Sequence, residues 1–197
     1  MDSQEMFRRR LAVITPQDQI IGAFLSGTIA SLAEGFKPGV AETVLKAWPP
    51  PQGLMQVTKY PGADLMKVMD LAAETAERQE GITYEAAVER MGRGSLRHVY
   101  RTSLGKIFAA MMGKDPHRVV SISIISAKAV ATWGEKTYEK LGPTSARLHL
   151  KREFMGPAWV LGFYREILLL AAGVSTVSLA IEDYQEPGME FSIRYTW

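Results

Sequence analysis

The chain has 197 residues, a net charge of +2 and no cysteine, with 47% hydrophobic and 22% charged residues. This composition is typical of a globular protein, and so mild a charge does not predict nucleic-acid binding. The lack of cysteine excludes disulfides, thiol catalysis and cysteine-ligated zinc or iron–sulfur sites. No apolar stretch approaches the roughly 20 residues that span a bilayer, so we expect a cytoplasmic protein without membrane contact.

The first residues carry the densest run of positive charge. We predict that residues 1–19 form a flexible lead-in on which Arg8–Arg10 is solvated. The apolar run that follows the arginines ends at Pro16 and is too short for a signal peptide. No repeat or low-complexity linker divides the remainder, and residues 20–197 are therefore predicted to form a single α+β domain.

The first part of this domain is predicted to be helical, because apolar residues recur there at helical spacing. Pro38 and the Asp115-Pro116 pair are good residues for starting helices, while Gly92-Arg93-Gly94 predicts a break. After a short extended entry at Ile20, the expected helices run to about Gly35 and then over residues 38–48, 61–79, 83–91, 95–112 and 116–133.

The pattern changes after this helical part. Alternation of apolar and polar residues predicts strands over 136–141, 145–151, 174–184 and 189–197, with a helix over 157–172 between the two pairs. The last strand alternates most clearly, and one face of it carries Met189, Phe191, Ile193, Tyr195 and Trp197. The fold class is thus α+β: a helical N-terminal part packed on a four-stranded antiparallel sheet, itself formed by a β-hairpin, a helix and a second β-hairpin.

Several short motifs occur in a fixed order along the chain: Asp115-Pro116-His117-Arg118, Gly142-Pro143-Thr144-Ser145-Ala146, Gly162-Phe163-Tyr164-Arg165, Ala172-Gly173 and the closing residues 191–197. With the C-terminal element order, they resemble the superfamily that contains haem-NO-binding sensors, 4-vinyl-reductase-type ligand domains and Bet3-like subunits of vesicle-tethering complexes. More closely, the chain from about Ile20 onward is similar to a myxobacteria-restricted family of paralogous proteins of similar length and unknown function. The resemblance implies a fold more than an activity. It also implies a dimer paired through helices, either a homodimer or a heterodimer with a paralogue.

Haem and metal binding are not predicted. The resemblance implies that haem-binding relatives ligate iron through a histidine on a helix and hold the propionates with Tyr-x-Ser-x-Arg. This chain has His98, His117 and His149 but lacks that signature, so we predict structural or surface histidines. The histidines are far apart and none has a ligand-type partner at helical spacing, so no metal and no cofactor are predicted.

Nothing in the sequence predicts catalysis. There is no Gly-x-Ser-x-Gly, and the neighbouring Glu182 and Asp183 would point to opposite faces of a strand. Gly92-Arg93-Gly94-Ser95 precedes a predicted helix and could hold an anion there, but it lacks the full phosphate-loop pattern. A plain helix break is the favoured interpretation, and the protein is predicted not to be an enzyme.

The remaining candidate site is the outer face of the predicted sheet, which would carry Arg147, His149, Lys151, Ser192 and Arg194. A basic and hydroxyl-bearing face beside exposed strand edges suits an acidic or extended peptide. We therefore predict a non-catalytic module that binds a peptide or protein partner, as an accessory protein that presents a precursor peptide to modifying enzymes of a natural-product pathway. The alternative is a small-molecule sensor that holds haem or an apolar ligand between the helices and the sheet.

Overall fold

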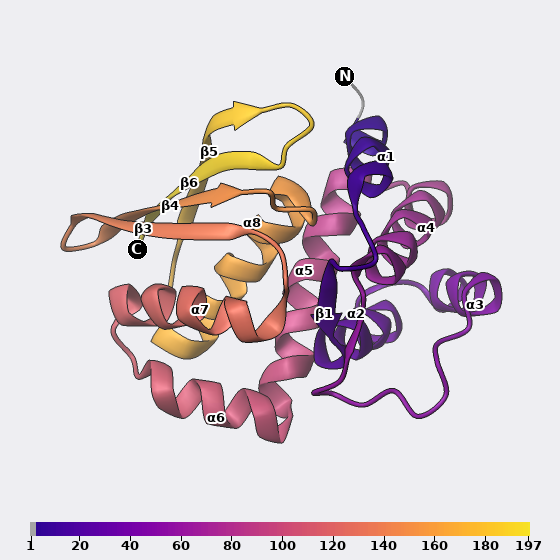
Figure 1. The fold of residues 1–197 in the computed structure, drawn as a ribbon, viewed down its shortest axis with the longest axis horizontal. Helices are drawn as coiled ribbons and strands as arrows, with labels where there is room; N and C mark the ends of the chain where they lie inside the picture. The colour runs from indigo at the N-terminus through magenta and orange to yellow at the C-terminus, as the bar shows by residue number, and fades with distance from the viewer. Residues whose placement is uncertain (1–2) are drawn as a thin grey trace.

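The structure, a computed structural model, describes residues 3–197. Figure 1 shows α1 to α4 on one side of the long helix α5, with the larger sheet, α7 and α8 on the other. Along the described residues the elements are α1 (Ser3–Val13), β1 (Gln19–Ile21), α2 (Gly22–Gly35), α3 (Pro38–Ala47), β2 (Lys59–Pro61), α4 (Gly62–Glu80), α5 (Tyr84–Arg101), α6 (Ser103–Met112), α7 (Pro116–Val130), β3 (Glu135–Gly142), β4 (Ser145–Lys151), α8 (Gly156–Ile167), the π-helical η1 (Leu168–Ala172), β5 (Ser178–Gln185) and β6 (Glu190–Thr196).

The predicted α+β fold class is confirmed. The four C-terminal strands form one antiparallel sheet in the order β3-β4-β6-β5, in which Leu148 lies opposite Ile193. One face of the sheet is covered by α7 and α8 (Figure 1). The side chains of the two central strands that point to these helices are fully buried, namely Ala146, Leu148, Leu150, Phe191, Ile193 and Tyr195. The alternation of the last strand therefore marks the core face of the sheet.

The short extended entry predicted at Ile20 is strand β1, but the two-stranded sheet that it forms was not predicted. Strand β1 pairs antiparallel with β2, and Ile20 also bridges to Ala131. Residues 52–60 lie between two predicted helices and outside any predicted strand, but Lys59–Pro61 forms β2. A strand of three residues is too short for alternation to show in the sequence.

The predicted helix break at residues 92–94 is wrong, because α5 runs unbroken from Tyr84 to Arg101. A Cβ atom at Gly92 would overlap the carbonyl oxygen of Trp159, and one at Gly162 would overlap that of Glu89. These glycines let α5 and α8 cross with their backbones in contact. The candidate anion site at Gly92-Arg93-Gly94-Ser95 is likewise wrong as a helix start, since it lies inside α5.

The chain breaks instead at Thr102. The Thr102 hydroxyl accepts a hydrogen bond from the backbone N–H of Gly105 at 3.2 Å and so caps α6. Thr102 is extended, with φ −79° and ψ 165°, which separates α6 from α5. A threonine in this position is a common N-cap.

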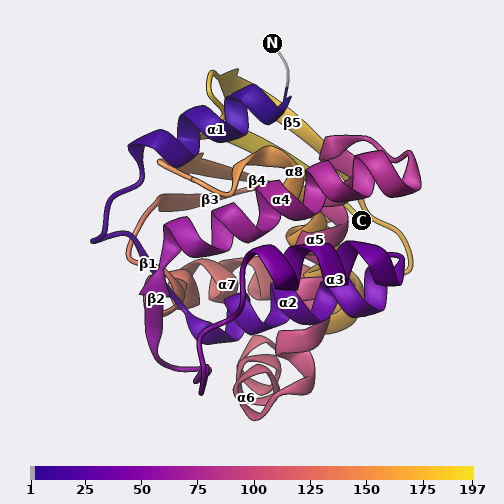
Figure 2. The ribbon, with the colours of Figure 1, turned by 90° about the vertical axis from the view of Figure 1, so that its right-hand side faces the viewer.

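The expectation of a flexible lead-in over residues 1–19 is also wrong for the part that the structure describes; residues 1–2 lie outside it. Helix α1 packs against α4 (Figure 2). Phe7 on α1 is fully buried. Arg10 is only 5% exposed and donates hydrogen bonds to the carbonyl oxygens of Phe154 at 3.0 Å and Pro187 at 2.6 Å. The charge run was interpreted as solvated, but backbone carbonyls can also satisfy a guanidinium inside the protein.

Asp18 connects the end of this N-terminal segment to the sheet through an ion pair. Its carboxylate is buried and accepts two hydrogen bonds from Thr15, both at 2.8 Å, and two from the Arg152 guanidinium, at 2.8 and 2.9 Å. Arg152 follows β4 directly. The bidentate ion pair therefore joins the segment before β1 to the end of a central strand.

This ion pair predicts a pH-dependent contribution to stability. Burial alone would raise the pKa of Asp18, but the bonds from Arg152 and Thr15 hold that pKa below its ordinary value of 3.8. A carboxyl with a lowered pKa stabilises the fold above its unfolded pKa, and the contribution is lost as the pH falls through the folded pKa. We expect Asp18→Asn to lower the free energy of unfolding at neutral pH by about 1–3 kcal/mol. Urea titrations at a series of pH values measure the difference from wild type.

As the pH falls below 3.8 and through the lowered folded pKa, that difference should shrink toward zero, because the folded wild-type carboxyl then becomes protonated as well. Glu42→Gln, which removes an exposed carboxylate on α3, is the matched control and should leave the pH profile unchanged. A difference that stays constant from neutral to acidic pH would contradict the role given to the Asp18 charge.

Candidate ligand-binding pocket

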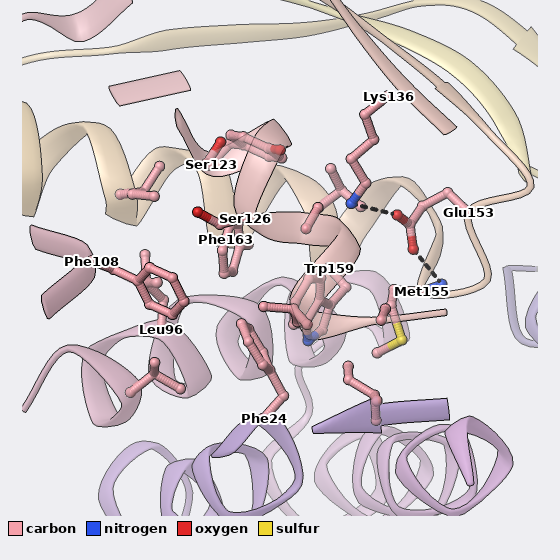
Figure 3. Close-up of a pocket in the computed structure, with 18 of the residues that line it drawn as sticks. Phe24, Leu96, Phe108, Ser123, Ser126, Lys136, Glu153, Met155, Trp159 and Phe163 are labelled. Atoms are coloured by element: carbon pink, nitrogen blue, oxygen red, sulfur yellow. Dashed lines mark hydrogen bonds and ion pairs between the residues drawn. The ribbon is translucent and has the colours of Figure 1, made fainter. Parts of the chain in front are cut away.

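An apolar pocket lies between the N-terminal helices and the sheet side of the molecule (Figure 3). Its cavity has a volume of about 90 Å³ and is partly open to solvent. Its walls come from β1, α2, α5, α6, α7 and α8, together with the start of β3. An apolar lining with only a few polar groups is typical of small-molecule sites.

Three aromatic rings form one wall of the pocket. Trp159 and Phe163 lie one turn apart on α8 and stack with their centroids 5.2 Å apart and their planes inclined by 15°. Phe24 of α2 lies against both rings, at 6.1 and 5.8 Å. The close crossing of α5 over α8 at Gly92 and Gly162 holds α8 in this position.

Helix α6 forms a thinly packed wall. Phe108 and Met112 line the pocket, but only Gly105 and Met112 of the ten residues in this helix are buried. Ile107 and Met111 are 59% and 50% exposed. Elements with few buried contacts open most readily, so α6 is the wall that we expect to move when a molecule enters.

A single ion pair interrupts the apolar lining. Lys136 of β3 contacts Glu153 with 2.9 Å between Nζ and Oε2, and the carboxylate is 97% buried (Figure 3). The other carboxylate oxygen accepts hydrogen bonds from the backbone N–H of Met155 at 3.2 Å and from Trp133 Nε1 at 3.5 Å. Burial would lower the pKa of Lys136, but the facing Glu153 outweighs burial and raises it. As an ion pair of one cation and one carboxylate, the two groups offset each other's charge.

One donor in the pocket wall is left without a partner. Trp159 is 6% exposed, and its indole Nε1 is buried without any hydrogen-bond acceptor within the described residues. Tyr195 Oη also lacks a hydrogen-bond partner within the described residues, but Tyr195 does not line the pocket. Most buried polar groups in native proteins have partners, so an unpartnered donor on a residue of the pocket wall is informative about what the pocket holds.

The residues of the predicted peptide site lie together, on the opposite face of the sheet. Arg147 faces Arg194 across β4 and β6, and His149 faces Ser192. Lys151 ends β4 on the same face. The structure thus brings all five residues together as the alternation indicated.

The cations of that face are already paired. Arg147 bonds to Glu139 and Glu182, both at 3.0 Å, and Arg194 lies 2.7 Å from Glu182. Lys151 lies 3.5 Å from Glu190. The His149 ring forms a hydrogen bond of 2.8 Å with the Ser192 hydroxyl. Ser192 itself is only 2% exposed. Peptide binding on this face stays a prediction.

The histidines lie outside the pocket. His117 in the first turn of α7 bonds to the Tyr138 hydroxyl and, at 3.0 Å, to the carbonyl oxygen of Pro143, and its ring packs on Trp197 at 4.8 Å. His98 lies half-buried on α5, and His149 is on the outer sheet face. Among residues 3–197, no three His, Asp or Glu side chains gather in a way that could hold a metal ion.

The fold is that of H-NOX domains. The chain is similar to the Fe(II) unliganded H-NOX protein from K. algicida (11% identity, 90% of this chain and 96% of that chain, TM-score 0.65). It is also similar to a Tt H-NOX variant (13%, 90% and 95%, 0.66) and to an oxygen-binding H-NOX domain related to soluble guanylate cyclases (12%, 90% and 94%, 0.57). Identities this low show a shared fold and no more.

The chain belongs to the family described as "Protein of unknown function (DUF2378)", which it matches over residues 14–197. No curated protein matches it significantly. Within the described part of the chain, none of the helices combines the length and the apolarity that crossing a bilayer requires.

Haem does not fit the lining of this pocket. Of the two features that the resemblance implies for haem binding, the sequence lacks Tyr-x-Ser-x-Arg, and no histidine is among the lining residues of the described chain. The lining contains no arginine either, and its one lysine, Lys136, is held by Glu153. Propionates would therefore meet no free cation there.

Proposed function

We propose that this protein is a non-catalytic sensor domain that binds a small apolar molecule in the pocket between α5, α6, α7 and α8. The observation that carries the proposal is the pocket itself: an apolar cavity walled by aromatic rings, with one neutral ion pair and one open donor. A few placed polar groups in an apolar lining are what small-molecule sites use to orient a ligand.

A solved structure with the same fold is a second observation that supports this proposal. A solved neighbour of the same fold is described as an oxygen-binding H-NOX domain in its oxygen complex. Ligand binding by this fold is thus known in a relative, although the residues for haem are missing here. We therefore propose a sensor domain whose ligand is not haem. Peptide binding at the outer sheet face ranks below it, because glutamates already pair with Arg147, Arg194 and Lys151.

Blocking the pocket tests this function. Ala127 of α7 lines the pocket, and we expect Ala127→Phe to fill the space and weaken binding of ethylnaphthalene, a small apolar probe, at least tenfold. Isothermal titration calorimetry measures the dissociation constants. A ring that occupies the cavity excludes the probe by volume, since protein interiors are close-packed.

The matched control is Ala129→Phe, the same substitution two residues further along α7 at an exposed position outside the lining. It should leave the dissociation constant unchanged. Native mass spectrometry of the protein as purified gives a second readout, in which a retained small molecule should be lost from Ala127→Phe alone. Equal probe binding by both variants, or none by wild type, would overturn the proposal.

A further inference from the structure

We infer that the natural ligand is an uncharged apolar molecule with a carbonyl-type oxygen that accepts a hydrogen bond from the indole of Trp159. This inference rests on the proposed function and names the chemical class of its ligand. It is carried by the open donor in the aromatic wall together with the charge balance of the pocket.

The indole N–H of Trp159 is a hydrogen-bond donor without a partner. The indole nitrogen can only donate, and no acceptor in the described chain reaches it. Its neighbours in the wall are the rings of Phe24 and Phe163, which offer no oxygen. In Figure 3 the nitrogen of Trp159 has no dashed line, whereas Glu153 is engaged on both of its oxygens. A buried donor without a partner is unfavourable, and a ligand oxygen removes this defect.

The charge balance decides between a neutral and an ionised ligand. Lys136 and Glu153 already neutralise each other, and the carboxylate also accepts two further hydrogen bonds. An ionised ligand would add a third charge with no counter-charge in an apolar lining, which is strongly unfavourable. A carbonyl, in contrast, needs one donor, and Trp159 supplies it.

The aromatic side chains of the pocket wall indicate the shape of the apolar part of the ligand. Trp159 and Phe163 are stacked, with Phe24 tilted against both. Aromatic side chains in this arrangement favour a flat ring placed face to edge or offset against them. A flat, uncharged aromatic ketone therefore represents the proposed class.

Three probes that share one ring system separate the possibilities. Ethylnaphthalene has no acceptor, acetylnaphthalene adds one neutral carbonyl, and naphthoate adds a charge. We expect acetylnaphthalene to bind the full chain roughly three- to tenfold more tightly than ethylnaphthalene, as one net hydrogen bond allows. Naphthoate should bind more weakly than either. Calorimetry measures all three dissociation constants.

The variant Trp159→Phe removes the donor and keeps an aromatic ring, so the affinity ratio of acetylnaphthalene to ethylnaphthalene should fall to about one. Trp48→Phe, at the end of α3 outside the pocket, is the matched control and should keep the ratio. The indole proton resonance of Trp159 in the wild-type protein is an independent readout, which should shift downfield with acetylnaphthalene and not with ethylnaphthalene. This readout keeps the test decisive if Trp159→Phe does not fold.

The outcomes distinguish this inference from the function on which it rests. Equal affinity for acetylnaphthalene and ethylnaphthalene would overturn the hydrogen bond to Trp159 and leave the apolar pocket in place. Tightest binding of naphthoate would overturn the uncharged ligand. Failure of all three probes to bind would overturn the proposed function itself.

Discussion

Gly162→Ala should destabilise the protein by about 2–3 kcal/mol or more, although alanine is the better helix former. The added Cβ would overlap the backbone carbonyl of Glu89, and backbone cannot move aside as a side-chain end can. Gly92→Ala should act in the same way against the carbonyl of Trp159. Helices α5 and α8 would have to separate, which disturbs the aromatic wall of the pocket as well. Urea unfolding monitored by circular dichroism measures the loss.

Gly35→Ala is the matched control. Gly35 ends α2, and a Cβ there would meet only the flexible Arg90 side chain at an ordinary 3.6 Å. We expect a change within about 0.5 kcal/mol for this substitution. If Gly162→Ala were neutral or stabilising, as helix propensity alone predicts, the close crossing of α5 and α8 would be refuted.

Lys136→Met should cost about 3–5 kcal/mol of stability, since it leaves the charge of Glu153 buried without a counter-charge. Lys136→Met combined with Glu153→Gln should recover most of this loss, because the uncharged side chain keeps an oxygen for Met155 and Trp133. The four proteins of this double-mutant cycle, compared by denaturant titration, give the coupling energy directly. Equal losses for the single and the double variant would contradict a charge-specific role of the pair.

The pH dependence of this pair has a definite sign. The pKa of Lys136 is raised above its ordinary value of 10.5, so in wild type the contribution is complete below that value and is lost as the pH rises through the folded pKa. In Lys136→Met this loss of stability in the alkaline range should be absent, because no lysine remains there to lose its proton.

The sequence predicted the sheet well because the sheet is a local pattern. The alternation of Phe191, Ile193 and Tyr195 identifies the core face without any knowledge of the partner strands. Aspartate and proline at residues 115 and 116 mark the start of α7 equally directly. Such features depend only on neighbours in the chain, and the structure reproduces them.

The wrong predictions concern residues whose environment is set by segments far away in the sequence. Gly92 was predicted to break a helix, but it is a contact point for the backbone of Trp159. Arg10 was predicted to be solvated, but it donates a hydrogen bond to the carbonyl of Phe154. The pocket was expected only in general terms, as a space between helices and sheet in the alternative interpretation. Its residues come from seven separate elements. The one hint in the sequence was the spacing of Trp159 and Phe163, which places two rings on one face of a helix.

The two hydrogen bonds of Arg10 also determine when, during translation, the fold can be completed. Their acceptors follow Arg10 by 144 and 177 residues, so α1 leaves the ribosome long before either carbonyl exists. The Arg10 guanidinium must wait, exposed or held by other contacts, until the last hairpin has been made. Non-local closure of this kind slows folding. We therefore expect the domain to complete its fold only after translation has passed Pro187.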